Sequence, residues 1–454
     1  MDKPGPINVA DVIDNAKIGG FQIRMFVLCA LSLIMDGFDV QVMGFVAPPI
    51  IAEWGVPRTV LGVVFAAGNF GMLVGALGFT MLADRIGRRP VLVGATLAFS
   101  MLTLATAMTS SIQQLLVLRF ITGVALGCVI PNATALIGEY SPRRKRVTLM
   151  MTITVGFTAG AAMAGFVSAW LIEDFGWRSV FYFGGSVPLV VGVLMYFFLP
   201  ESLQFLVLRR RNLDKVGKWL VQIEPTTSPD VTRYVVHEEQ RQGVPALHLV
   251  RDGRALGTVL LWIVNFMNIL VLYSVSNWLP TVVNGAGYST TTAALVGAVQ
   301  QVGGTLGTFA LAALISRQGF VPVLTASFAV ACVSIAMIGQ SLASLALLFV
   351  VVFIAGWSVI GAQPGVNALA ATFYPTYLRS TGIGWGLGIG RIGAIVGPIL
   401  GGIFLSRQWT PGQLFIAAAT PAFVSCLAIF AFRWAARASA TEAPGATVAA
   451  TRTS

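Results

Sequence analysis

Long apolar runs recur along this chain and strongly limit what it can fold into. A helix needs about 20 apolar residues to cross the hydrocarbon core of a bilayer. Because a segment in lipid must satisfy its backbone hydrogen bonds internally, each such run predicts a transmembrane helix. We therefore predict an all-α polytopic membrane protein with twelve transmembrane helices, at approximately residues 21–45, 59–82, 91–108, 115–138, 147–172, 179–199, 255–279, 291–315, 321–340, 345–373, 380–405 and 414–432.

The composition supports the same class of protein. Apolar residues make up 56% of the chain and charged residues only 10%, whereas about 25% charged residues is ordinary in soluble domains. These values exclude a soluble, disordered or collagen-like protein. The sequence also lacks a nucleotide-binding loop, a metal-ligand cluster and a paired nucleophile and base. We therefore expect a protein that is not an enzyme and needs no metal or cofactor.

The distribution of basic residues predicts the orientation. The chain has 29 Lys and Arg residues against 18 Asp and Glu, and basic residues collect in the cytoplasmic loops of membrane proteins. With both termini in the cytoplasm, the basic residues left in outer loops are Arg58, Arg178 and Arg407. We therefore expect the positive charge to orient the chain in a bacterial-type inner membrane, and we expect no nucleic-acid partner.

The predicted spans form two groups. Residues 1–20 form a cytoplasmic N-terminal segment, 21–199 a six-helix bundle, 200–254 a central cytoplasmic loop, 255–434 a second six-helix bundle and 435–454 a disordered cytoplasmic tail. Two such halves around a central site are typical of alternating-access transporters. We predict that the halves are pseudo-symmetric, because residues match at an offset of 233, in the pairs Gly71/Gly304, Gly123/Gly356, Pro142/Pro375, Arg146/Arg379, Thr148/Thr381 and Gly160/Gly393.

The loop between the second and third spans reads GFTMLADRIGRRPVL (residues 78–92). It resembles the loop signature of the major facilitator superfamily, which implies that family's fold and a cytoplasmic latch between the halves. The resemblance makes Asp84, Arg85 and Arg88 gating residues. Glu139 ends the fourth span just before a basic run that begins at Arg143. We expect a gate ion pair between Glu139 and Arg85 or Arg88, and we expect Arg143 to be a further gating residue.

A narrower resemblance covers nearly the whole chain. The first span carries DGFDVQVMGFVAP (36–48), the fourth LRFITGVALGCVIPNATALIGEYSP (118–142), the sixth ends in PES (200–202) and the eleventh carries GIGRIGAIVGPILGG (388–402). Together these segments are similar to the aromatic acid:proton symporter family, which takes up benzoate-type acids. The resemblance implies that the acids of the DGFD element are needed for transport. The glycines between 393 and 402 predict close helix packing.

Ionisable side chains deep in the membrane are costly and are functional candidates. Asp36 and Asp39 share one face of the first span because they are three residues apart. Two carboxylates this close in a medium of low dielectric constant are hard to ionise together, so one of them can hold a proton. We predict that Asp36 and Asp39 couple transport to protons. The alternative is a static ion pair with Arg119 in the fourth span, and both interpretations can hold together.

Arg391 lies near the middle of the eleventh span. Its planar guanidinium matches a carboxylate in a bidentate geometry, and the sequence from 255 to 434 contains no Asp or Glu. An anionic substrate is therefore the simplest counter-charge for Arg391. Arg119 is a second candidate for the substrate carboxylate, although the two aspartates compete for it.

Polar and aromatic residues complete the candidate site. Gln363 and Asn367 share a face of the tenth span, and Asn265 and Asn268 a face of the seventh. These amides can bind substrate hydroxyl groups or form hydrogen bonds between helices. The aromatic candidates can stack on a substrate ring, or else pack in the core or face lipid; they are Phe38, Trp357 and Trp385.

These features predict proton-coupled uptake of an aromatic carboxylate by a monomer in the lipid bilayer. Moving an anion into a negative cytoplasm costs about 2.3 kcal/mol per 100 mV, so at least one proton has to accompany it. The alternatives are a symporter of another organic acid anion, an exporter, and a membrane sensor of aromatic acids.

Overall fold

The computed structural model describes residues 7–224, 234–235, 246–251 and 253–441. The chain divides into two compact units. Unit 1 comprises Met1–Ile50 and Ala67–Gln240, and unit 2 comprises Ile51–Ala66 and Arg241–Ser454. Within the described residues, twelve helical segments are long and apolar enough to cross a membrane. The predicted number of spans is therefore confirmed.

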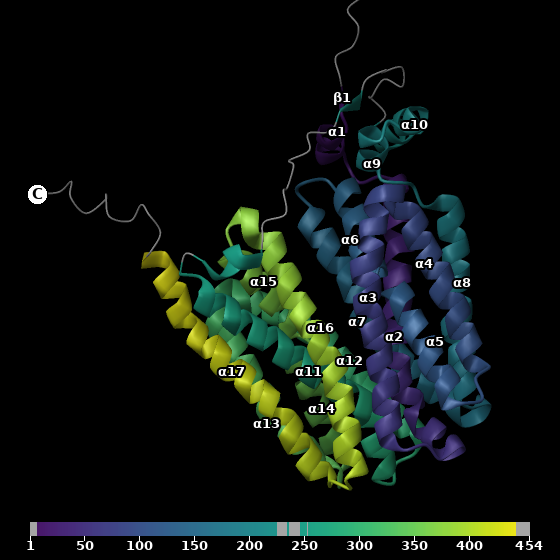
Figure 1. The fold of residues 1–454 in the computed structure, drawn as a ribbon, viewed down its shortest axis with the longest axis vertical. Helices are drawn as coiled ribbons and strands as arrows, with labels where there is room; N and C mark the ends of the chain where they lie inside the picture. The colour runs from purple at the N-terminus through teal and green to yellow at the C-terminus, as the bar shows by residue number, and fades with distance from the viewer. Residues whose placement is uncertain (1–6, 225–233, 236–245, 252, 442–454) are drawn as a thin grey trace, which may run out of the picture. The chain divides into compact units, whose positions relative to one another are not determined.

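Each unit is built on a bundle of long helices (Figure 1). The helices of the first half are α2 (Gly20–Trp54), α3 (Arg58–Ile86), α4 (Arg88–Ala107), α5 (Ile112–Leu126), α6 (Val129–Tyr140), α7 (Arg146–Phe175) and α8 (Trp177–Phe198). Of these, α3 begins within unit 2. Those of the second half are α11 (Ala255–Gly285), α12 (Thr290–Gln318), α13 (Phe320–Ser341), α14 (Leu345–Val359), α15 (Ala362–Phe373), α16 (Thr376–Ser406) and α17 (Pro411–Thr441).

Short elements lie at one end of unit 1 (Figure 1). They are β1 (Ile7–Asn8), α1 (Val9–Asn15), α9 (Leu203–Leu208), α10 (Leu213–Ile223) and β2 (Tyr234–Val235), while unit 2 adds the 3₁₀ helix η1 (Ala246–Val250). β1 and β2 pair in parallel, so the N-terminal segment and the central segment fold onto each other.

The end of the last span differs from the prediction. Helix α17 continues past Trp434 to Thr441, so the helix extends into the segment that we expected to be disordered. The remainder of that predicted tail, residues 442–454, lies outside the described residues.

The predicted repeat is visible in the helix boundaries. Adding 233 to the bounds of α5 and α6 gives the bounds of α14 and α15. Both pairs are interrupted at equivalent points, and proline explains the interruptions: Pro131 and Pro364 lack the N–H that would bond to the carbonyl four residues earlier. The fourth and tenth spans therefore each consist of two helices.

Glycines bring the backbones of neighbouring helices into direct contact. A Cβ on Gly37 would lie 1.9 Å from the Phe157 carbonyl oxygen, and one on Gly160 would lie 1.8 Å from that of Ile34, so α2 and α7 touch backbone to backbone. The same arrangement recurs where Gly393 and Gly397 of α16 approach carbonyls of α11. The close packing predicted for the glycine run is confirmed, as expected where small residues let membrane helices associate.

We predict that Gly37→Ala destabilises the protein, because the added methyl group has to displace the α7 backbone. Overpacking of this kind costs about 1–3 kcal/mol, which should appear as a lower apparent melting temperature in detergent. Gly94→Ala is the matched control, since nothing lies within 4 Å of a Cβ on Gly94 of α4. Equal melting temperatures for the two variants would contradict the prediction.

Candidate functional site

A buried ion pair joins three helices of unit 1. Arg119 of α5 donates to both carboxylate oxygens of Asp39 of α2, with Nη2–Oδ2 at 2.7 Å and Nη1–Oδ1 at 3.2 Å, and to the Asp39 backbone carbonyl at 3.0 Å. Thr103 of α4 donates to Asp39 Oδ1 at 2.6 Å. Both charged side chains are buried. A fork that binds both oxygens, with further hydrogen bonds, is what a charge pair needs inside a membrane protein.

The other residues of the DGFD element pack around this pair. Asp36 lies one turn before Asp39 on α2 and is fully buried. Gly37 presses α2 against α7. Phe38 is also fully buried, and its ring packs on Phe183 with centroids 5.7 Å apart. Phe38 is therefore a core residue of unit 1 in this structure, and its stacking on a substrate stays a prediction.

In unit 2, Arg391 occupies the middle of α16. It is half-buried and lies between Gly390 and Gly393, the residues that pack against α11. Unit 2 has other basic residues in its helices, but they lie toward helix ends, at Arg58, Arg317, Arg379, Arg433 and Arg437. Arg391 is thus the cation placed at mid-helix depth, where ionisable groups have functional roles.

Four amide side chains of unit 2 form one hydrogen-bonded network across α11 and α15. Gln363 is its centre: Gln363 Oε1 accepts from Asn268 Nδ2 at 2.7 Å, and Gln363 Nε2 donates to Asn265 Oδ1 at 3.1 Å and to Asn367 Oδ1 at 3.3 Å. Asn268 Nδ2 also donates to the Val359 carbonyl. Hydrogen bonds between the helices are therefore confirmed, while recognition of hydroxyl groups stays a prediction.

The two candidate tryptophans have different surroundings. The Trp385 ring pairs with Trp262 of α11, with centroids 6.0 Å apart, and half of the Trp385 side chain stays exposed. Trp357 packs against the hydrophobic core of unit 2, and its backbone meets Gly307 of α12. Trp385 therefore keeps an accessible ring face, whereas Trp357 supports packing.

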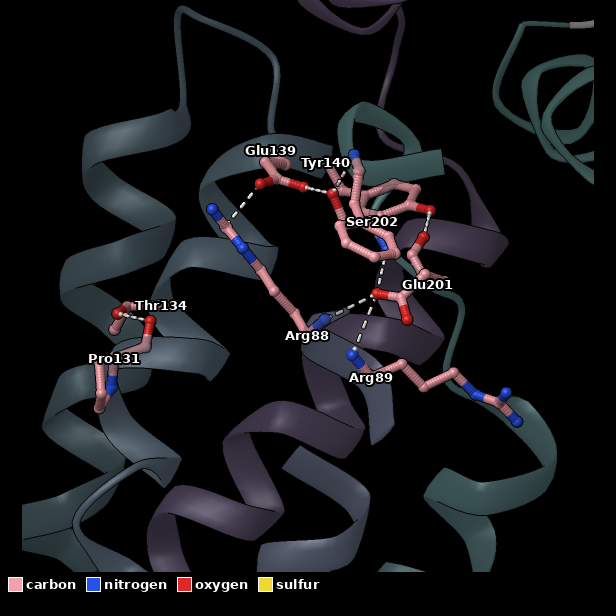
Figure 2. Close-up of polar contacts among 9 residues, drawn as sticks. Arg88, Arg89, Pro131, Thr134, Glu139, Tyr140, Glu201 and Ser202 are labelled. Carbon is pink, nitrogen blue, oxygen red and sulfur yellow. Dashed lines mark hydrogen bonds and ion pairs between the residues drawn. The ribbon is translucent and has the colours of Figure 1, made fainter. Parts of the chain in front are cut away.

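A second polar cluster lies at the end of unit 1 that also carries α9. Glu139 of α6 forms an ion pair with Arg88 of α4, 2.5 Å apart, and accepts a hydrogen bond from the Ser202 hydroxyl (Figure 2). Glu201 Oε1 accepts from the backbone N–H groups of Arg88 at 2.9 Å and Arg89 at 3.1 Å. A carboxylate at the first turn of a helix satisfies free N–H groups and favours the helix dipole.

Glycine is required at the turn that leads into α4. Gly87 has a φ of 107°, and a Cβ there would lie 2.3 Å from Glu201 Oε2. The Tyr140 hydroxyl donates to the Glu201 carbonyl at 2.6 Å, and Gln22 donates to the Tyr140 carbonyl at 2.8 Å. This cluster, which we call the Glu139–Glu201 cluster, thus ties α2, α4, α6 and the start of α9 together.

The sequence indicated only part of this cluster. The Glu139–Arg88 pair was one of the two expected, but Glu201 was missed, although the PES segment that follows the sixth span was the available signal. The other predicted gating residues are exposed; they are Asp84, Arg85 and Arg143. The Asp84 carboxylate nevertheless lies close enough to interact electrostatically with Glu139. The Asp84 backbone carbonyl accepts from Arg209 at 3.3 Å.

The chain matches a known family of proteins. The family model for the Major Facilitator Superfamily matches residues 29–385 and 261–452. The chain belongs to the major facilitator superfamily. It is therefore a membrane transporter and not an enzyme. Within the described residues, no group of three or more His, Cys, Asp and Glu side chains is placed to hold a metal ion.

Several similar proteins are named as transporters of benzoate-type acids. The chain is 39% identical to the 4-hydroxybenzoate transporter PcaK of Pseudomonas putida, over 93% of this chain and 95% of that one. It is 40% identical to the gallate transporter of Pseudomonas putida (94% and 95%) and 31% identical to the benzoate transport protein of Acinetobacter baylyi (93% and 92%). The solved D-xylose-proton symporter has the same fold, with a TM-score of 0.72 at 16% identity over 91% of this chain and 97% of that one.

We predict that Asp39→Asn and Arg119→Gln each destabilise the protein by about 3–5 kcal/mol, because each leaves a buried charge uncompensated. The double variant should lose less than the sum of the two. Apparent melting temperatures in detergent measure this coupling.

The matched control for these single and double variants is the ion pair between Asp14 and Arg146. The two side chains are 2.5 Å apart but partly exposed, at 26% for Asp14 and 35% for Arg146. Exposed pairs contribute about 0–1 kcal/mol, so Asp14→Asn and Arg146→Gln should change the melting temperature little. Strictly additive losses at Asp39 and Arg119 would show that the buried pair is not coupled.

Proposed function

We propose that this transporter takes up aromatic carboxylates together with protons across a bacterial inner membrane, with both termini in the cytoplasm. The substrate class follows the relatives, which carry 4-hydroxybenzoate, gallate and benzoate by their names. The observation that carries the proposal within this chain is Arg391, a mid-helix guanidinium in a half whose helices contain no Asp or Glu from 255 to 434.

Arg391 binds the substrate carboxylate in this proposal. A guanidinium offers two parallel N–H donors to a carboxylate, and the pair is strong where water is excluded. The half-buried position of Arg391 leaves part of its side chain accessible. The accessible face of Trp385, which lies six residues earlier on α16, can contact an aromatic ring.

Asp36 and Asp39 carry the proton coupling. A proton on Asp39 cancels the negative charge that holds Arg119. Protonation is therefore linked to the packing of α2, α4 and α5, because these helices supply Asp39, Thr103 and Arg119. Arg119, once released, is a second cation for the substrate. This linkage supplies the coupling that an anion needs to enter against the membrane potential.

The Glu139–Glu201 cluster serves as the cytoplasmic gate, and the protein acts as a monomer. The cluster joins the first turn of α4 to the end of α6 and the start of α9 through charge-assisted hydrogen bonds, which can break and re-form as the transporter alternates between states. The exposed residues Asp84, Arg85 and Arg143 complete the gate when it closes.

The first test is uptake of labelled 4-hydroxybenzoate into proteoliposomes under an inward proton gradient. Arg391→Gln should reduce initial uptake at least about 30-fold, because losing one partner of a buried charge pair costs about 2–5 kcal/mol. Arg407→Gln is the matched control, since Arg407 is exposed at the C-terminal end of the same helix. Wild-type rates in Arg391→Gln would refute its role, and no uptake of any benzoate-type acid by the wild type would refute the function.

A second test separates proton coupling from substrate binding. Asp36→Asn and Asp39→Asn should abolish accumulation driven by the proton gradient, because an amide cannot take up and release a proton. At least one of the two should retain exchange of labelled for unlabelled substrate at equal pH on both sides. If both variants still accumulate substrate when the gradient is applied, the coupling is not carried by these residues.

A further inference from the structure

The amide network of unit 2 contains an acceptor with no donor. Asn268 is 0% exposed, and its Nδ2 donates to both Gln363 Oε1 and the Val359 carbonyl. Because a backbone carbonyl can only accept, the Val359 contact fixes the nitrogen on that side and leaves Oδ1 facing away. Among the residues that the structure describes, none donates a hydrogen bond to Asn268 Oδ1. Buried carbonyl groups are rarely left in this state, so this one needs an explanation.

The position of the network relative to Arg391 suggests the explanation. A Cβ on Gly386 of α16 would lie 3.2 Å from Asn265 Nδ2, so the network touches α16 at this residue. Gly386 precedes Arg391 by five residues, which is about 7.5 Å along the helix axis. The acceptor, Asn268, directly precedes Ile269, which a Cβ on Gly390 beside Arg391 would contact. A small aromatic acid is therefore long enough to reach both the network and the Arg391 side chain.

Aromatic faces lie at the same level of the bundle. Trp385 directly precedes Gly386, and its ring packs on Trp262, which is one helical turn before Asn265 on α11. The amide network therefore has a cation on one side along α16 and an aromatic pair on the other. A ligand that bears a charge, a ring and a hydroxyl group has a partner in each of these three kinds of side chain.

We infer that the amide network is the subsite that recognises a hydroxyl group on the aromatic ring of the substrate, with the phenolic O–H donating to Asn268 Oδ1. This inference rests on the proposed function, in which Arg391 holds the carboxylate. Gln363 positions the acceptor, because it holds Asn268 and Asn265 at once. An unsubstituted ring leaves Oδ1 without a donor, so the transporter prefers hydroxylated acids to benzoate.

The test compares initial uptake of labelled 4-hydroxybenzoate and labelled benzoate in proteoliposomes. The wild type should favour 4-hydroxybenzoate by about tenfold, the factor expected for one buried hydrogen bond. Asn268→Leu should bring the ratio of the two rates close to one while the benzoate rate changes less than about threefold. Asn268→Ala, which removes the acceptor without adding branched volume, should shift the ratio in the same direction.

Gln301→Leu is the matched control, because Gln301 is a buried amide of α12 in the same unit whose Nε2 bonds only weakly to Ser276 at 3.4 Å. Its ratio should equal that of the wild type. A ratio that stays at the wild-type value in both Asn268 variants overturns the inference, as does an equal loss of both substrates, which is what a packing role produces. A wild type that carries both acids equally overturns the hydroxyl subsite alone, whereas a wild type that carries neither overturns the proposed function as well.

Discussion

The ion pair between Asp39 and Arg119 shows the constraint that governs the rest of the structure. In a medium of low dielectric constant, a charge is tolerated only where another group compensates it. The pair meets this condition inside unit 1, with Thr103 and a backbone carbonyl supplying the remaining hydrogen bonds. The same constraint acts on the backbone, which is why the described part of the chain is almost entirely helical and why glycines such as Gly37 let helices meet directly.

The two halves of the repeat have similar helices, but the charged side chains deep in their spans differ. The proline-interrupted helices and the glycine contacts recur at an offset of 233. The charged positions deep in the spans do not recur: Leu272 and Val352 stand at the equivalents of Asp39 and Arg119, and Thr158 stands at the equivalent of Arg391. Similar helix packing therefore carries acids in one unit and a mid-helix cation in the other, so the function resides in a few side chains and not in the fold.

Sequence patterns predicted the features that depend on local composition. The twelve spans, the repeat and the glycine packing follow from apolar length and residue spacing, and these were confirmed. Contacts between distant segments were harder to predict. Glu201 binds the first turn of α4 although the two are more than 100 positions apart in the sequence, and no periodicity of the sequence predicts this contact. Phe38 shares its helix with Asp36 and Asp39, yet only the structure shows that its ring packs inward on Phe183.

The distribution of deep charges gives a physical reason for joint movement of an anion and a proton in the proposed cycle. With both carboxylates ionised, Asp36, Asp39 and Arg119 give unit 1 a deep charge of about minus one, and Arg391 gives unit 2 about plus one. One proton neutralises the first unit, and one carboxylate neutralises the second. Loading only one of them leaves a net charge to move through the membrane field, which the potential opposes for the anion. Full loading removes both charges, so the loaded transporter changes state at the lowest electrostatic cost.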